Sequence, residues 1–550
     1  MSEPVGYEYL LNRWRLPVFP VTMPAVVAPV TRVTVQADRL LIPSGVAPHT
    51  SNPLDHILFA LKHEGINLQV LSQILPHVTA EDLGREIWAR PNSRYVRVAA
   101  YLWEHFTGRR LADAPPITAS TTPIFDASQY LVSADPQKDF RWRVAFNGLG
   151  NLEYCVTVRR TDTIQNLLDE DIVEQTRRFF EQTEQPVLDR AITWAYLGET
   201  EGSFAIEHEK VSGNKAEAFA ALLRNAFHPD ACNEKYLTGL QKAIITNPLD
   251  RATGYRGIQN WLGNGMRGAA GVAYLPPPPE LLHKIMPHIE EMANTLHQKV
   301  DPLVAAGIVS FAFVYAHPFM DGNGRLSRFL FHRTLAQSGR METATTGKML
   351  LPVSIAMKRH EAGYLRALQS FSKPARHLWD VQWFDQDQFT FRLNGDGAVY
   401  RYWDATNEVQ FSLQMAKEAL REDLQMEVKL LTHYDAIYRQ VDTMYDVRSS
   451  DLSILVLSCL QNAGVVSKNR RKKFSATVPE LVFNAIEQAW AEKVLPLSKS
   501  ESADTASHAA RHKVPEDALR KLHKKLHEST DSPVGVAVGR KPSGSGGPGF

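Results

Sequence analysis

The sequence contains little cysteine, with three residues in 550, at positions 155, 232 and 459. They are far apart and form no Cys-x-x-Cys pair, which argues against a disulfide framework and against a thiolate zinc site. A reducing compartment fits this usage best. No stretch approaches about 18 uninterrupted apolar residues, and the N-terminus lacks a basic segment followed by an apolar one. We therefore expect a cytoplasmic protein with no membrane partner.

An excess of either charge is also lacking. The chain has 61 Lys and Arg against 60 Asp and Glu, a formal net charge of +1. This balance argues against chain-wide binding to nucleic acid or to a membrane surface, although it leaves room for a local basic patch. Hydrophobic residues make up 44% and charged residues 22%, as in ordinary globular proteins. At about 100–200 residues per domain, the length predicts three or four domains.

Proline content and apolar periodicity divide the chain into regions. The first fifty residues are rich in proline, which predicts extended segments or a strand-and-loop lead-in. From Pro53 the periodicity changes to that of helices, which complete an N-terminal region over 1–125. Two short strands joined at Gly148–Gly150 predict a small hairpin, and helices resume after Thr161. The predicted regions that follow are a central helical region over 126–395, a C-terminal helical module over 396–497 and a mostly disordered tail over 498–550.

One stretch interrupts the central helices. Residues 253–279 are rich in Gly, Asn and Pro and cannot form a regular helix. A loop of this length inside a helical domain is more often functional than incidental.

The most informative segment is HPFMDGNGRLSR, residues 317–328. An apolar helical run precedes it, and a second helix follows and stops at Gly339, so we expect a helix–loop–helix corner. The glycines allow a tight turn and a close approach to a ligand. The loop opens onto a helix N-terminus, which favours an anion, and Arg325 and Arg328 share a face of its first turn. These features predict a polyphosphate cradle.

Three further side chains of this segment suit phosphoryl chemistry. Asp321 can hold Mg²⁺, which typically binds through one or two carboxylates plus substrate phosphates. His317 can accept a proton from an incoming hydroxyl, and Asn323 can stabilise charge on a reacting phosphate. The alternative is that Gly, Asn and Asp merely form a turn with solvated arginines. That would be the better interpretation of an isolated Asp-Gly-Asn-Gly, but not of all twelve residues between two apolar helices.

The segment resembles the signature of the Fic family, His-Pro-Phe-x-Asp-Gly-Asn-Gly-Arg-x-x-Arg, at every specified position. The resemblance implies a mainly α fold: a multi-helix Fic core with a short β-hairpin flap, beside an N-terminal helical domain and a C-terminal helical, winged-helix-like module. It also implies transfer of AMP from ATP to a protein hydroxyl with release of pyrophosphate.

By the family's roles, His317 would be the general base that deprotonates a Ser, Thr or Tyr, and Asp321 would hold Mg²⁺. The ATP phosphates would be bound by the backbone of Gly322 and Gly324 and by the side chains of Asn323, Arg325 and Arg328. The implied substrate and cofactor are thus ATP and Mg²⁺.

Ser203 and Glu207 lie one helical turn apart. Alone, the pair is best explained as an ordinary helix with a capping serine. Within a Fic protein it resembles the family's inhibitory motif, Ser/Thr-x-x-x-Glu-Gly/Asn, in a helix at about 200–210. The glutamate would pair with Arg328 and displace the γ-phosphate. His208 departs from the motif, because Gly or Asn is expected there.

Two other features resemble family elements. Residues 253–279 resemble the flap that aligns a target peptide by strand addition, with Tyr255, Trp261 and Tyr274 as candidate docking residues; packing anchors are the alternative. Tyr364 is placed where the family often has an aromatic residue near the adenine, and core packing is at least as good an explanation.

The basic run 468–473 (KNRRKK) suggests contact with nucleic acid, although a solvated turn is the better explanation. Helices around it at 450–497 are compatible with a winged-helix module that contacts nucleic acid or protein. His332 and His360 lack partners at metal-ligand spacing and are interpreted as ordinary histidines.

The sequence therefore predicts a protein adenylyltransferase, a nucleotidyltransferase of the Fic type, held in check by Glu207. Its predicted partner is a target protein with an exposed hydroxyl, and auto-AMPylation and a homodimer are compatible with this hypothesis. One alternative is transfer of UMP, phosphate or phosphocholine. The other is a DNA-binding or scaffold regulator whose Fic core senses a nucleotide.

Overall fold

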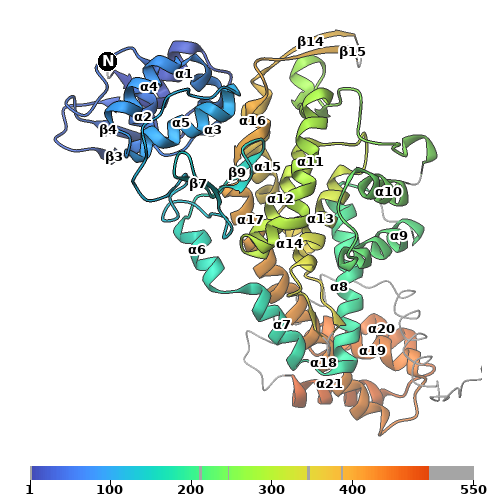
Figure 1. Cartoon of the computed structure of the whole chain (residues 1–550). Coiled ribbons are helices and arrows are strands. Elements are labelled where there is room, and N and C mark those ends of the chain that lie inside the picture. The colour runs from blue at the N-terminus through green and yellow to red at the C-terminus, as the bar shows by residue number, and fades with distance from the viewer. Residues whose placement is uncertain (1–2, 210–212, 246, 344–346, 386–387, 495–550) are drawn as a thin grey trace, which may run out of the picture. The chain divides into compact units, whose positions relative to one another are not determined.

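The computed structural model of the chain describes residues 3–209, 213–245, 247–343, 347–385 and 388–494. The fold is mainly α (Figure 1). The chain divides into two compact units, residues 1–424 and 425–550. Within the described ranges, no helix combines the length and the apolar character that crossing a membrane would require. The predicted tail over 498–550 lies outside the described residues.

The N-terminal part of the first unit combines a small sheet with helices. Four strands pair in the order β1-β2-β4-β3: β1 (Pro4–Val5), β2 (Ala25–Val27), β4 (Arg39–Ile42) and β3 (Thr34–Gln36). The helices are α1 (Gly6–Trp14), α2 (Pro53–His63), α3 (Leu68–Ile74), α4 (Ala80–Ala89) and α5 (Arg94–Thr107). Helix α2 begins as predicted, because Pro53 is its first residue and the Asn52 side chain accepts a hydrogen bond from Leu54 N. No helix was predicted in the lead-in; α1 forms there because residues 6–14 contain no proline.

Short strands connect this part to the central helices. They are β5 (Thr122–Pro123), β6 (Gln137–Asp139), β7 (Val144–Phe146), β8 (Leu149–Gly150) and β9 (Cys155–Thr157). The predicted hairpin, with its joint at Gly148–Gly150, was wrong: Leu149 and Gly150 form β8, and it is β8 that pairs with β9 in an antiparallel hairpin. Strand β7 pairs instead with β5 and β6, and β9 also pairs in parallel with β16 (Tyr402–Asp404).

The central part is a bundle of helices. They are α6 (Asp162–Asp169), α7 (Ile172–Gln182), α8 (Gln185–Ile206), α9 (Gly213–Arg224), α10 (Glu234–Ile244), α11 (Pro279–Thr295), α12 (Pro302–Ala316), α13 (Asn323–Gln337), α14 (Val353–Arg359), α15 (Glu361–Arg376), α16 (Ala398–Arg401) and α17 (Thr406–Glu418). Helix α12 is apolar and buried on every side except at Val314, as expected of a helix in the middle of a core. It packs against α11, α13 and α17 (Figure 1).

The first unit extends past the predicted boundary at 395/396, since residues 396–424, which include α16, β16 and α17, belong to it. Helix α17 belongs to the first unit and packs against α12. The second unit contains α18 (Gln425–Asp442), α19 (Ser449–Gln461), α20 (Lys468–Phe474) and α21 (Glu480–Lys493) around an apolar core of its own. The basic run 468–473 is helical rather than a turn. The predicted domain limits otherwise stay predictions.

Two antiparallel hairpins lie at the edge of the core. The first pairs β10 (Leu262–Gly263) with β11 (Val272–Tyr274) inside the predicted flap, which contains no α-helix in residues 253–278. The second pairs β14 (Trp379–Asp385) with β15 (Gln388–Leu393) and was not predicted. Trp261 of the first contacts Phe389 of the second, with ring centroids 5.0 Å apart. A further pair, β12 (Glu342–Thr343) and β13 (Gly347–Lys348), follows α13.

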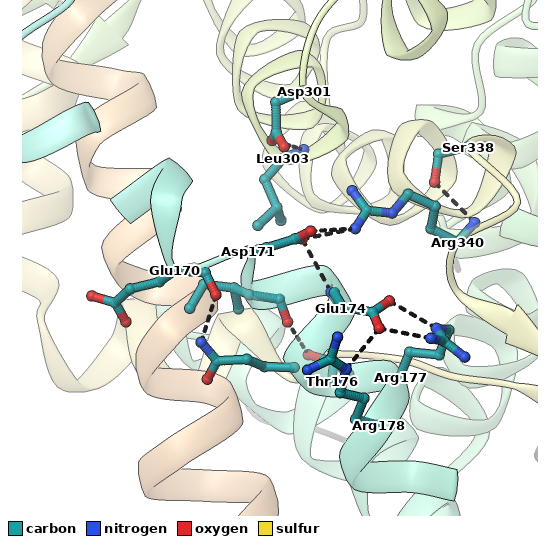
Figure 2. A network of polar contacts seen from close by, with 12 residues as sticks. Glu170, Asp171, Glu174, Thr176, Arg177, Arg178, Asp301, Leu303, Ser338 and Arg340 are labelled. Carbon is teal, nitrogen blue, oxygen red and sulfur yellow. Dashed lines mark hydrogen bonds and ion pairs between the residues drawn. The ribbon is translucent and has the colours of Figure 1, made fainter. Parts of the chain in front are cut away.

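Polar side chains cap or link the ends of α7, α12 and α13 (Figure 2). Asp171 caps α7, with its Oδ1 accepting from Glu174 N at 3.2 Å, and both its oxygens lie within 2.8 Å of Arg340 Nη2. Asp301 caps α12 by accepting from Leu303 N at 2.9 Å. Ser338, just after α13, accepts from Arg340 N at 3.2 Å. The Asp171–Arg340 pair therefore links the start of α7 to the segment that follows α13, whereas Asp301 caps α12 from within its own helix.

Candidate functional site

His317 stands where α12 ends. It is 9% exposed and adopts a left-handed conformation, with φ 49° and ψ 58°, while its N–H donates to Phe313 O at 3.0 Å. The corner predicted from the sequence is thus formed, with α12 before it and α13 after it. A left-handed conformation is uncommon for a residue with a Cβ, so the surrounding contacts must hold it in place.

The imidazole of His317 is oriented by a backbone carbonyl. Its Nδ1 lies 3.2 Å from Val314 O, an acceptor that requires a proton on Nδ1. Nε2 therefore carries the lone pair. Burial lowers the pKa of His317 to about 4, and the charge of Arg256 acts in the same direction, whereas the bond to Val314 and the nearby Glu207 and Asp321 oppose it. A neutral imidazole with a free Nε2 has the form that a general base needs.

The loop between the helices is closed by Asn323. Its Oδ1 accepts from Phe319 N at 3.0 Å and its Nδ2 donates to Phe319 O at 2.7 Å, so both polar groups of the side chain hold the turn. The predicted contact of this side chain with phosphate stays a prediction. Gly322 has φ +89°, which a residue with a Cβ rarely adopts, and it places α13 directly after the turn.

The Asp321 carboxylate faces solvent, with 53% of the side chain exposed, and lies 3.5 Å from Arg325 Nη2. In the part of the chain that the structure describes, no group of three or more His, Cys, Asp or Glu could by itself hold a metal ion. A single exposed carboxylate beside a phosphate site suits Mg²⁺, because that ion takes most of its ligands from water and substrate phosphates.

Arg328 is buried, and three hydrogen bonds attach it to the helix that carries the second motif. Its Nε donates to Ser203 Oγ at 2.7 Å, and its Nη2 donates to Ser203 O at 2.9 Å and to Glu207 Oε1 at 2.8 Å. Arg328 is 1% exposed. The structure thus brings together Ser203, Glu207 and Arg328, which the resemblance to the inhibitory motif had linked.

The carboxylate of Glu207 also occupies the N-terminus of α13. A Cβ built on Gly324 would lie 2.0 Å from Glu207 Oε1, so the carboxylate rests directly on this glycine. Burial opposes ionisation of Glu207, but the charge and hydrogen bond of Arg328 outweigh it and lower the pKa. A carboxylate therefore stands where helix amides and two arginines favour an anion.

His208 follows Glu207 and has φ +56°. Gly and Asn adopt this conformation most readily, which is the physical reason for expecting one of them here. His208 adopts it nonetheless, and its Nε2 lies 3.4 Å from Glu361 Oε1. The departure from the motif therefore leaves the position of Glu207 intact.

The sequence analysis missed a second carboxylate at the site. Glu209 Oε1 lies 3.4 Å from Arg325 Nη2, and Glu209 Oε2 lies 3.4 Å from Lys215 Nζ. These three residues and Asp321 line a cavity of about 260 Å³, together with Ile244, Ile245, Asn247 and Asp250. Arg325, which is buried, also lies 5.3 Å from the ring centroid of Phe204. Each motif arginine is thus paired with a carboxylate from the segment that ends α8.

Helix α8 is held by contacts that the sequence did not reveal. Glu199 is fully buried, accepts from Ser354 N at 2.7 Å and lies 2.8 Å from His332 Nε2. A Cβ on Gly202 would lie 2.7 Å from the backbone of Ser354, so the two helices touch there. His332 is therefore a packed helix histidine, as expected, and it anchors the helix that carries Glu207.

The candidate docking residues of the flap differ in exposure. Tyr255 and Tyr274 are buried, and their hydroxyls donate to Glu290 and to Tyr315 O. These contacts make both of them packing anchors, which was the alternative interpretation. Trp261 is half-buried against Phe389.

Tyr364 is also buried, at 8% exposure, and packs between Phe311 and Phe411. Burial raises the pKa of its phenol, while the nearby charge of Arg328 opposes the rise. Core packing describes this residue, and its predicted role beside an adenine stays a prediction.

Comparison with known proteins finds similarity over the part of the chain that contains the helix–loop–helix corner. Residues 232–335 match the model of the Fic/DOC family. The proteins named "Protein adenylyltransferase Fic" from Drosophila melanogaster and Drosophila virilis are each 36% identical over 67 residues. That match covers 12% of this chain and only 14% of each relative.

Solved structures of similar proteins resemble parts of the chain. A Fic family protein from Desulfovibrio desulfuricans has a TM-score of 0.35 and 20% identity, over 51% of this chain and 80% of that one. A Fic domain containing signaling protein from Bacteroides thetaiotaomicron has a TM-score of 0.35 and 15% identity, over 49% of this chain and 96% of that one.

Proposed function

Because residues 232–335 form a Fic domain, we propose that the chain is a Fic-type transferase that moves AMP from ATP to the hydroxyl of a target protein, under inhibition by Glu207. The observation that carries the proposal is the juxtaposition of a neutral, oriented imidazole with an anion cradle at the start of α13. Either element alone has structural explanations, whereas the two side by side suit transfer of a phosphoryl-linked group.

The residues fit a triphosphate. Gly324 leaves open the space that a Cβ would fill, and a carboxylate already rests there in place of a phosphate oxygen. Arg325 and Arg328 are buried cations on one side of the helix N-terminus. With ATP bound, Asp321 would hold Mg²⁺ against the phosphates, and the ion would neutralise charge that builds up on pyrophosphate.

In the proposed reaction, Nε2 of His317 takes the proton of the acceptor hydroxyl as the oxygen bonds to the α-phosphorus. The bond from the α-phosphorus to the bridging oxygen breaks, and pyrophosphate leaves with its electron pair. The N-terminus of α13 and the two arginines stabilise charge on the phosphate oxygens. No covalent enzyme intermediate is required.

Glu207 provides the inhibition in this proposal. Its carboxylate uses the same arginine and the same helix N-terminus that the outer phosphates of ATP would use. Two anions cannot share the site, so ATP must displace Glu207 or bind in another, unproductive position.

The test is transfer of radiolabel from α-³²P-ATP to protein by the Glu207→Gly variant, followed by mass spectrometry of labelled peptides from a lysate. AMP on Ser, Thr or Tyr supports the proposal. Label from another nucleotide or donor, with none from ATP, would assign a different transferred group to the same site. Label that persists in the Glu207→Gly, His317→Ala double variant would remove His317 as the base.

A further inference from the structure

Arg256 is a buried cation that bonds only to backbone. Its side chain is 4% exposed, and in the described part of the chain all its hydrogen bonds end on carbonyl oxygens. Nε donates to His317 O at 2.9 Å, and Nη1 donates to Ile258 O at 3.1 Å. Nη2 donates to Pro277 O at 2.5 Å and more weakly to Ala316 O at 3.5 Å. Burying a guanidinium without a neighbouring carboxylate is costly, which indicates that Arg256 has a specific role at this position.

The carbonyls that Arg256 binds belong to the end of helix α12. Its side chain reaches Ala316 O and His317 O, and its own N–H donates to Pro318 O at 2.8 Å. The last carbonyls of a helix have no partner within the helix, and the negative end of the dipole favours a cation. Arg256 meets both needs at the three residues centred on His317.

These bonds act on a strained residue. A left-handed conformation is unfavourable at a residue other than glycine and persists only where the surroundings enforce it. For His317, with φ 49°, the backbone is held by Phe313 O on its amide side and by Arg256 on its carbonyl side.

We propose that Arg256 is a positioning residue for His317. The guanidinium N–H groups of Arg256 fix the backbone at His317, so that Nδ1 stays on Val314 O and Nε2 faces the acceptor hydroxyl. The inference rests on the proposed role of His317 as the base. Arg256 itself reaches no substrate, since the flap backbone and the end of α12 surround it.

The charge of Arg256 supports the same role. Burial lowers the pKa of Arg256 to about 10, and the phenols of Tyr274 and Tyr400 oppose that effect. The cation in turn disfavours a proton on His317, against the carboxylates of Glu207 and Asp321. Arg256 thus favours both the position and the neutral form of the imidazole.

Two substitutions separate these effects, both made in the Glu207→Gly chain. Arg256→Met removes both the charge and the guanidinium hydrogen-bond donors, whereas Arg256→Lys keeps the charge but loses the planar set of donors. We expect kcat to fall about 100-fold in Arg256→Met, the scale of a misplaced catalytic group, with the KM for ATP within about twofold. Arg256→Lys should lose part of kcat, and only Arg256→Met should move the acid limb of the pH profile upward.

Arg97 provides a matched control. It is also 4% exposed, and among the described residues its hydrogen bonds all end on backbone carbonyls, those of Ser120, Trp142 and Arg143, far from the motif in sequence. Arg97→Lys should leave kcat and the pH profile unchanged. An equal loss in Arg97→Lys, or a rise in KM at constant kcat in Arg256→Met, would overturn the inference.

A second measurement does not depend on transfer. The ring ¹⁵N shifts of His317, assigned by comparison with His317→Ala, report which nitrogen is protonated. We expect a single Nδ1–H tautomer in the native chain and a mixture in Arg256→Met, or in Arg256→Lys if the Met variant does not fold. If no variant transfers label, the proposed function fails, but the ¹⁵N shifts still test the role of Arg256. An unchanged tautomer of His317 in the Arg256 variants would overturn that role.

Discussion

Glu207 and Gly324 touch at the point where helix α13 begins. The carboxylate lies so close to the glycine that a Cβ there would stand 2.0 Å from Oε1. The contact explains two features at once: why the first turn of α13 carries no side chain at this position, and how a helix from another part of the fold can block it. The same space serves a phosphate oxygen in the proposed reaction, so inhibition and binding compete for one site.

Removing the carboxylate should release the site. Glu207→Gly should raise transfer of AMP about 10-fold to 100-fold, because a hydrogen bond to a charged group is worth about 1.5–3 kcal/mol. Glu207→Gln should give a smaller rise, since it keeps the shape and loses the charge. The measurement is initial rate of label transfer at fixed ATP.

The matched control for this prediction is Glu201→Ala, which removes an exposed carboxylate from the same helix. It should leave the rate unchanged. Equal rates in native and Glu207→Gly chains would contradict the assignment of Glu207 as the inhibitor.

A second carboxylate should contribute less. Glu209 lies 3.4 Å from Arg325 and is one-third exposed, so solvent weakens this pair relative to Glu207 with Arg328. Glu209→Ala should therefore raise the affinity for ATP by a few fold at most, as measured by calorimetry. Lys215→Ala, which removes the other partner of Glu209, should lower it, because the carboxylate would then lie on Arg325 alone. We therefore expect the affinity for ATP to rise in Glu209→Ala and to fall in Lys215→Ala.

The helix–loop–helix corner could be predicted because its signals are local. An apolar run ends at Pro318, glycines follow, and a second periodic helix begins, all within consecutive residues. The pairing of Glu207 with Arg328 was implied by the resemblance to the family's inhibitory motif, whereas Ser203 and Glu207 by themselves indicated only an ordinary capped helix. These features depend on residue type and order alone.

The remaining contacts depend on the tertiary fold. Arg256 reaches the carbonyl of His317 across 61 positions, and Glu199 reaches Ser354 across 155. No periodicity marks such contacts. The left-handed conformation of His317 was equally hidden, because a histidine gives no sign of it. Glu209 lies two positions after Glu207, but only the turn through His208 shows that it faces Arg325.

The lowered pKa of His317 should cost the folded chain stability in acid. Burial lowers its pKa to about 4, from 6.5 in the unfolded chain. Between these values the unfolded chain binds a proton that the folded chain does not. Stability is therefore lost as the pH falls from about 6.5 towards 4, by up to about 3 kcal/mol.

The comparison that isolates this effect is His317→Gln against the native chain. The free energy of unfolding in urea should fall less between pH 7 and pH 4.5 in the variant, because glutamine does not titrate. His77→Gln, at an exposed histidine, should follow the native chain. An identical loss in all three proteins would show that His317 titrates at an ordinary pKa.

Asp321 should control the response to Mg²⁺ rather than the binding of ATP itself. Its carboxylate is about half exposed and shares the cavity with Arg325. Asp321→Ala removes a negative charge from a site for a polyanion, so ATP without metal should bind at least as tightly as in the native chain. With Mg²⁺ present, transfer should fall, and the Mg²⁺ concentration at half-maximal rate should rise about 10-fold or more.

Asp250→Ala is the control, because Asp250 lines the same cavity and already accepts a hydrogen bond from Asn247 at 2.7 Å. If Asp250→Ala shifts the Mg²⁺ response and Asp321→Ala does not, the metal is held on the other side of the cavity, and the in-line arrangement around His317 would have to be rebuilt from there.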